Sequence, residues 1–230
     1  SKGGGIYSRN EKKIPLSAEA KVALGIDESH TDVTPNELMS AILCAPVDLL
    51  WNGGIGTYVK AVTETHAQVG DKANDGLRID ASQLRCRIVG EGGNLGFTQK
   101  GRIEASLNGV RINTDAIDNS AGVDTSDHEV NLKILLSLRR GLPETQRNEL
   151  LKSLTDAVAS HVLEDNKVQN QVLTIAESQS ASMAHVHERV IAQWESEGRL
   201  KRGLESLPTT NALLERLREG RGLCRPELSV

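Results

Sequence analysis

The feature that most constrains the fold is a set of three short apolar runs, each followed at once by small or polar turn-forming residues. The runs cover residues 47–51, 86–89 and 110–113. Their aliphatic and β-branched content, with turn residues at the carboxyl ends, predicts three strands. Between the second and third runs, residues 98–108 have the pattern of a helix that ends at Gly109. Strand, helix and strand then occupy about 28 residues, which predicts parallel neighbours in one sheet.

The glycine content and the hydrophobic periodicity of the chain change along its length. Glycine is frequent up to about residue 124, whereas apolar stripes of period 3.6 dominate from about residue 126. We expect a mixed α/β fold: a partial doubly wound, Rossmann-like parallel sheet followed by an α-helical region. The boundary is predicted near Gly141-Leu142-Pro143, which divides the chain into residues 1–140 and 141–230. Helices are expected at 17–24, 34–44, 57–67, 126–139, 144–163, 167–178, 183–195 and 211–218.

Composition narrows the functional classes. The net charge is −4, from 27 basic and 31 acidic residues that are scattered along the chain, so neither nucleic acid nor an anionic membrane surface is an expected partner. No run of 18 apolar residues occurs, so no membrane span is expected. The three cysteines are few, distant and odd in number, which predicts a reducing, cytoplasmic compartment. The Gly-rich start without Met and the interrupted helix start at 225–230 predict an excised fragment.

Three Gly/Asn-rich segments are candidates for a ligand crevice. They are residues 52–56, 90–96 and 119–126. For any one of them a plain turn is the favoured interpretation, but three in register with successive strands favour a crevice at the carboxyl ends of a parallel sheet. Ser126 or Thr125 is also a candidate N-cap, whose helix amides would suit a carboxylate, with capping alone as the alternative.

Longer motifs carry a resemblance to a known family. Residues 46–60, 89–96 and 112–124 resemble segments of the large NAD-specific glutamate dehydrogenases of bacteria, as do 1–5 with 14–16 and 222–228. The resemblance covers nearly the whole chain. It implies a fragment of an enzyme that oxidatively deaminates L-glutamate to 2-oxoglutarate and ammonia with NAD. Residues 1–140 would be the carboxyl-terminal half of its nucleotide-binding domain, and 141–230 the start of a helical carboxyl-terminal region.

The smaller glutamate dehydrogenases are similar at two motifs, which suggest roles for individual residues. Their Glu-Gly-Ala-Asn turn appears here as residues 91–94, and their Asn-Ala-Gly-Gly-Val segment with a later Ser appears as 119–126, in a shifted reading at Ala121-Gly122. The resemblance implies that Asn94 and Asn119 lie at the nicotinamide and that Val123 and Ser126 bind substrate. The predicted cofactor-side residues are Asn52, Gly53, Gly54, Gly93, Asn94 and Asn119.

No catalytic residue is assigned within the chain. The family's catalytic Lys and Asp lie upstream, and no G-x-G-x-x-G loop follows a strand here. The expected partners are therefore L-glutamate or 2-oxoglutarate, the remainder of the same polypeptide and further copies in a homo-oligomer. The alternative is a non-catalytic regulatory or subunit-interaction module, which the amphipathic stripes of residues 144–195 allow.

Other polar groups favour structural interpretations, and no metal site is expected. Residues 71–82 depart from a calcium-loop pattern, and His185 and His187 would point to different sides of a helix. Glu91 either orients a ribose hydroxyl or caps a turn, and the turn is favoured. The charged residues 124 and 127–129 are expected in a solvated first helical turn. Cys44 is expected to pack as a small apolar residue.

Overall fold

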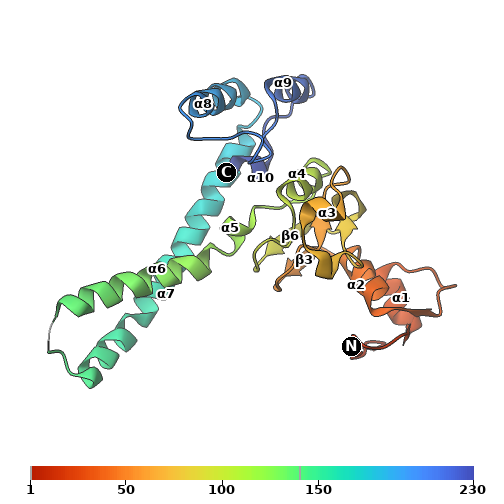
Figure 1. Cartoon of the computed structure of the whole chain (residues 1–230), viewed down its shortest axis with the longest axis horizontal. Helices are drawn as coiled ribbons and strands as arrows, with labels where there is room; N and C mark the ends of the chain where they lie inside the picture. The colour runs from red at the N-terminus through yellow and green to blue at the C-terminus, as the bar shows by residue number, and fades with distance from the viewer. Residues whose placement is uncertain (1, 140) are drawn as a thin grey trace.

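The computed structural model describes residues 2–139 and 141–230, so Ser1 of the opening motif and Arg140 at the predicted boundary lie outside the described residues. Three lobes meet at the centre of the molecule (Figure 1). An α/β lobe contains the amino-terminal half, two long helices project as a paired arm, and short helices near the C-terminus form the third lobe. The candidate ligand residues belong to the α/β lobe and the start of the arm.

The amino-terminal part of the α/β lobe contains a small antiparallel pair and two helices. Strand β1 (Ile14–Pro15) pairs with β2 (Asp32–Val33), and helices α1 (Ala18–Leu24) and α2 (Pro35–Leu43) follow these two strands. Both helices begin where the sequence predicts, because Ser17 accepts from the amide of Ala20 and Thr34 from that of Glu37. The β1–β2 pair was not predicted.

The capping box of α2 provides a local stability test. Thr34 donates its amide to Glu37 at 2.7 Å and accepts the Glu37 amide at 3.3 Å. Thr34→Ala should cost about 1 kcal/mol of local stability, seen as faster hydrogen exchange in the first turn of α2 within the full-length polypeptide. Thr31→Ala, an equally exposed threonine outside the box, is the control and should leave exchange unchanged. Equal exchange in both variants would show that the cap contributes nothing.

The stability that this cap gives to α2 depends on pH through the Glu37 carboxyl. The backbone amide of Thr34 and then its hydroxyl hold the pKa of Glu37 below its ordinary value. A carboxyl with a depressed folded pKa stabilises the fold above its unfolded pKa, and that contribution is lost as the pH falls through the folded pKa. The α2 cap therefore stabilises the helix at neutral pH.

The predicted parallel pair forms the centre of the lobe. Strand β3 (Leu49–Asn52) lies parallel to β6 (Ile88–Glu91), with Asn52 opposite Glu91 at their carboxyl ends. The third predicted strand is reduced to a single parallel bridge between Ile88 and Arg111. The Arg111 backbone still makes two 2.9 Å hydrogen bonds with the β6 side, to Val89 and to Arg87. Parallel order is confirmed, although residues 2–139 and 141–230 do not form a complete doubly wound sheet.

The link between β3 and β6 differs from the prediction. The helix expected at 57–67 is wrong: Val59–Lys60 forms strand β4, which pairs in parallel with β5 (Ile79–Asp80). Val59 is fully buried, so packing into the core overrides the local helical pattern. The link also contains α3 (His66–Val69) and two 3-10 turns, Lys72–Asn74 and Ala81–Gln83. The core beneath it consists of Val59, Ile79, Ala81, Cys86, Val89, Phe97, Ala105, Val110 and Ile112.

Helix α4 (Gln99–Leu107) is confirmed, with Thr98 as its N-cap. The segment after residue 113 differs from the prediction. Helix α5 (Asp115–Asp118) leads through Asn119 directly into α6 (Ser120–Leu138), so the predicted start at residue 126 is wrong. Ser120 is buried, and its hydroxyl accepts a hydrogen bond from Asn166 at 2.9 Å. This long-range contact stabilises the early start of α6.

Helix α7 (Glu144–Ser178) runs back along α6 and completes the arm (Figure 1). Two helices were expected at 144–163 and 167–178, but the chain continues through Asn166 without a break. The reason is that the Asn166 side chain bonds to the carbonyl of Ile117 and to Ser120 instead of capping its own helix. The predicted boundary at residues 141–143 falls in the turn between α6 and α7.

The third lobe consists of α8 (Ala184–Ser196), α9 (Thr210–Arg218) and α10 (Arg225–Leu228) around a second core of Ile191, Leu207, Leu213 and Leu223. Helices α8 and α9 match the predictions at 183–195 and 211–218. Arg225 is buried and joins this lobe to the others, because its guanidinium bonds to Asn113, Thr174 and Asn170. Among the described residues, no helix combines the length and the apolar character that crossing a bilayer requires.

Candidate functional site

The first two Gly/Asn-rich segments lie in contact at the carboxyl ends of β3 and β6. The amide of Gly93 donates to the carbonyl of Asn52 at 3.1 Å. A Cβ atom on Gly93 would lie 2.7 Å from the carbonyl oxygen of Gly54, so only glycine permits this approach. The Asn52 side chain turns inward, accepting from the Gly54 amide at 3.3 Å. The structure thus places Asn52 between the loops, with Gly53 and Gly54 exposed.

The third segment joins them through two side-chain amides. Asn119 donates from Nδ2 to Oδ1 of Asn94 at 2.5 Å, although the two residues are 25 positions apart. Asn94 is exposed and Asn119 is half-buried, so both amides border solvent. All six residues predicted at the cofactor side therefore belong to three segments linked by direct hydrogen bonds.

Two acidic side chains of α5 hold the loop after β6 in shape. Asp115 accepts the amide of Leu95 at 2.7 Å, and Asp118 accepts the amide of Glu91 at 2.8 Å. Leu95 has a φ of 59°, a left-handed conformation that a branched side chain rarely adopts, so the contact with Asp115 offsets local strain. Burial raises the pKa of Asp118, and the Glu91 amide and Asn113 act against that rise.

Beneath the loop lies a buried ion pair that the sequence reasoning missed. Arg102 Nε donates to Glu91 Oε2 at 2.6 Å, and Nη2 donates to Oε1 at 3.0 Å. Glu91 also accepts the amide of Phe97 at 3.0 Å, which closes the turn. Burial raises the pKa of Glu91, while the Arg102 guanidinium favours its charged form. Because Glu91 is 0% exposed, the ribose role is wrong and the turn role is confirmed.

Arg102 makes a further contact that ties the ion pair to the loop. Its Nη2 lies 3.2 Å from Asp115, the residue that holds Leu95. Arg102 is buried on α4, as are Ile103 and Ala105, so a basic residue among the apolar residues of this helix was the available sequence signal. The Glu91–Arg102 pair therefore supports the backbone of the loop that contains Asn94.

The two residues predicted at the substrate side extend from Asn119 along α6. Val123 and Ser126 are four and seven positions after Asn119, a spacing that places all three on one helix face. Val123 is 62% exposed and Ser126 is exposed. The predicted N-cap role of Ser126 or Thr125 is wrong, because both lie inside α6 and the Thr125 hydroxyl donates to the carbonyl of Ala121 at 2.7 Å. Any bond from Ser126 to a ligand therefore comes from its hydroxyl.

Charged residues 124 and 127–129 are also placed differently from the prediction. They lie within α6 and not in its first turn, and Asp124 and His128 are half-buried against α7. Cys44 is half-buried beside the first core, as expected for a small apolar residue, and burial raises its pKa. All three cysteines are free.

An apolar pocket of about 280 Å³ opens beside Asn52. Its wall includes the backbone of Gly53 and Gly54 together with Leu50, Trp51, Tyr58 and Phe97. Asn94 and Asn119 do not line this pocket. Their two side-chain amides border solvent and carry both donor and acceptor groups, as the carboxamide of a nicotinamide needs. The residues fit that end of a dinucleotide, whereas a pyrophosphate loop is not part of this sequence.

Comparison with known proteins identifies the family. Residues 1–176 match the family described as the catalytic domain of bacterial NAD-glutamate dehydrogenase. The chain belongs to this family. The NAD-specific glutamate dehydrogenases of Halomonas elongata and Pseudomonas aeruginosa are 53% and 52% identical to it, and that of Mycobacterium tuberculosis is 50% identical. Each alignment includes 100% of this chain but only 14–15% of the relative.

Membership of the bacterial NAD-glutamate dehydrogenase family has a consequence for the arm. The matched region reaches residue 176, so it includes all of α6 and nearly all of α7. The arm is therefore shared with the family's catalytic domain. The division of the chain at residue 140 stays a prediction.

Proposed function

We propose that the chain forms the nicotinamide-side wall and part of the glutamate pocket of a bacterial NAD-dependent glutamate dehydrogenase. The observation that carries this proposal is the Asn119–Asn94 contact, which joins the loop after β6 to the start of α6 in a chain of this family. The enzyme would deaminate L-glutamate oxidatively to 2-oxoglutarate and ammonia. The β3–β6 pair would belong to a doubly wound sheet completed by the rest of the polypeptide.

Each group then has a defined task. NAD, when bound, supplies the hydride acceptor. Asn94 and Asn119 orient the nicotinamide through its carboxamide, and the loop glycines Gly53, Gly54 and Gly93 allow the ring to approach the backbone. Val123 contacts the aliphatic part of the substrate side chain, and the Ser126 hydroxyl donates to its distal carboxylate. Proton transfer and pyrophosphate binding come from the remainder of the polypeptide.

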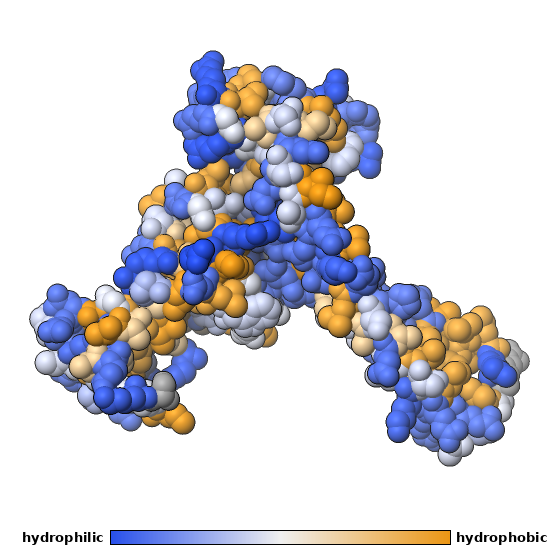
Figure 2. Space-filling model, turned by 180° about the vertical axis from the view of Figure 1, so that it is seen from behind, coloured by the Kyte–Doolittle hydropathy of each residue, from blue (hydrophilic) through white to orange (hydrophobic). Residues whose placement is uncertain are grey.

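Exposed apolar side chains support the proposal that the rest of the polypeptide packs against this chain. Trp51 and Leu49 on β3 are 60% and 52% exposed, at the edge where further strands of a doubly wound sheet would pair. Figure 2 shows apolar side chains at the surface of all three lobes. On α6, four large apolar side chains are at least half exposed: Val130, Ile134, Leu135 and Leu138. We propose that the rest of the polypeptide and further copies in a homo-oligomer cover these surfaces, in the cytoplasm, where the three cysteines stay reduced.

Cofactor binding tests the Asn119 assignment. Asn119→Ala removes a neutral hydrogen bond worth about 0.5–1.5 kcal/mol, which corresponds to a two- to tenfold weaker affinity for NADH. The measurement is fluorescence titration of NADH into the full-length enzyme. We call the helix face that carries Asn119, Val123 and Ser126 the Asn119 stripe. Asn131→Ala, at an exposed position of α6 outside this stripe, is the matched control and should bind NADH as the wild type does.

The same variants discriminate against the alternative of a non-catalytic interaction module. Under the proposal, Asn119→Ala keeps the assembly state of the wild type in size-exclusion chromatography while NADH affinity falls. An unchanged NADH affinity combined with a loss of assembly contradicts the proposal and favours the module.

A further inference from the structure

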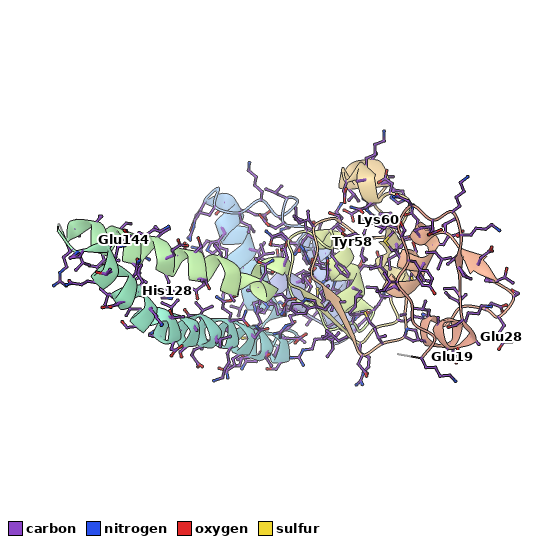
Figure 3. The ribbon with its side chains drawn as sticks, turned by 90° about the horizontal axis from the view of Figure 1, so that it is seen from below. Glu19, Glu28, Tyr58, Lys60, His128 and Glu144 are labelled. Atoms are coloured by element: carbon purple, nitrogen blue, oxygen red, sulfur yellow. The ribbon has the colours of Figure 1, made fainter. Side chains whose placement is uncertain are left out.

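A cluster of possible metal ligands lies between the two helices of the arm, on the side of α6 away from the Asn119 stripe. Asp124 and His128 are one helical turn apart on α6, and Asp165 faces them from α7. One ligand atom from each lies within 4.8 Å of the other two. Figure 3 shows His128 between the ribbons of the two helices. None of these residues takes part in the proposed glutamate site.

The distances in this cluster differ from those of an ordinary hydrogen-bonded pair. His128 Nε2 is 3.7 Å from Asp124 Oδ1, longer than the 2.7–3.2 Å of a normal hydrogen bond. Ligand bonds of about 2.0–2.2 Å at tetrahedral angles separate ligand atoms by about 3.3–3.6 Å. Moreover, Asp124 Oδ2 is buried and has no hydrogen-bond partner among the residues that the structure describes. The Asp124–His128 separation is thus close to that of two ligands on one cation, and a bound cation would satisfy the buried Asp124 oxygen.

A second imidazole lies beside the three ligands. His161 precedes Asp165 by one turn on α7, and its ring centroid is 6.1 Å from that of His128. The two helices thus carry Asp-x-x-x-His and His-x-x-x-Asp in opposite directions, which brings both pairs to the same level of the arm. The carboxylates of Asp124 and Asp165 together balance the charge of a divalent cation.

We propose that Asp124, His128 and Asp165 bind a zinc-class divalent cation. Nitrogen and oxygen donors in this ratio suit Zn²⁺ or Co²⁺ and not Ca²⁺, which takes oxygen ligands alone. Asp165 and His161 are exposed, so the cation enters from solvent. Bound there, it links α6 to α7 and fixes the helix that also carries Val123 and Ser126.

The test is metal binding to the full-length enzyme after chelator treatment. Isothermal titration with Zn²⁺ alone and the visible absorption of added Co²⁺ compare the wild type with His128→Ala and Asp165→Asn. Because the binding free energy is shared among three protein ligands, each variant should lose this site's affinity by on the order of 100-fold, together with the tetrahedral Co²⁺ spectrum. Asp165 is exposed, so its conservative replacement leaves the fold intact.

His185→Ala is the matched control, because it removes an exposed histidine from α8, away from the cluster. It should bind Zn²⁺ and Co²⁺ as the wild type does. The proposal is overturned if wild type, His128→Ala and Asp165→Asn bind Zn²⁺ with the same stoichiometry and affinity. It is equally overturned if Co²⁺ gives the same spectrum in all three proteins.

Discussion

Arg102→Leu is expected to destabilise the loop after β6 by about 3–5 kcal/mol, because it leaves the Glu91 carboxylate charged, buried and unpaired. Glu91 is 0% exposed, and Arg102 provides two of its hydrogen bonds. The loss should appear as a more than about 100-fold drop in hydrogen-exchange protection at the amides of Leu95 and Phe97. Exchange in the full-length enzyme, followed by mass spectrometry, measures this local opening.

An exposed ion pair in the same chain provides the control. Lys133 and Glu129 form a pair on α6 in which both side chains are more than half exposed (69% and 59%). Lys133→Gln should therefore leave local protection close to that of the wild type, because solvent screens the exposed pair. Adding Glu91→Gln to Arg102→Leu removes the unpaired charge and should restore part of the protection. If Arg102→Leu leaves the Leu95 and Phe97 amides as protected as in the wild type, the ion pair does not support the loop.

Local signals in the sequence were sufficient for the helix starts at Ala18, Pro35 and Gln99. Each depends on a side chain that caps an amide three residues away, so no distant contact is needed. The start of α6 was predicted wrongly for the opposite reason. Ser126 has the local appearance of a cap, but the helix begins at Ser120 because of the contact with Asn166, 46 positions away.

The candidate site likewise contains features that the sequence predicts and features that depend on tertiary packing. The meeting of the loops at Gly54 and Gly93 follows from the rule that parallel strands end at one edge, and it was predicted. The Glu91–Arg102 pair was not, because the partner of a buried carboxylate depends on how α4 packs beneath the loop. The placement of Asp124 and His128 against Asp165 depends on the pairing of α6 with α7, which sequence periodicity alone does not define.

Helix α6 contributes residues both to the candidate substrate site and to the proposed cation site. One face carries Asn119, Val123 and Ser126, and the side near α7 carries Asp124 and His128. The central claim is that the first face receives the substrate, with the Ser126 hydroxyl bound to its distal carboxylate. Removing a hydrogen bond to a charged group costs about 1.5–3 kcal/mol, or roughly 10- to 100-fold in kcat/KM.

Steady-state kinetics of Ser126→Ala in the full-length enzyme test this claim most directly, with L-glutamate compared against L-norvaline, which lacks the distal carboxylate. Ser137→Ala, whose hydroxyl donates to the carbonyl of Ile134 within its own helix, is the control. The account predicts that Ser126→Ala lowers kcat/KM for L-glutamate by roughly 10- to 100-fold and leaves that for L-norvaline unchanged. An equal effect on both substrates, or no effect on L-glutamate, would contradict it.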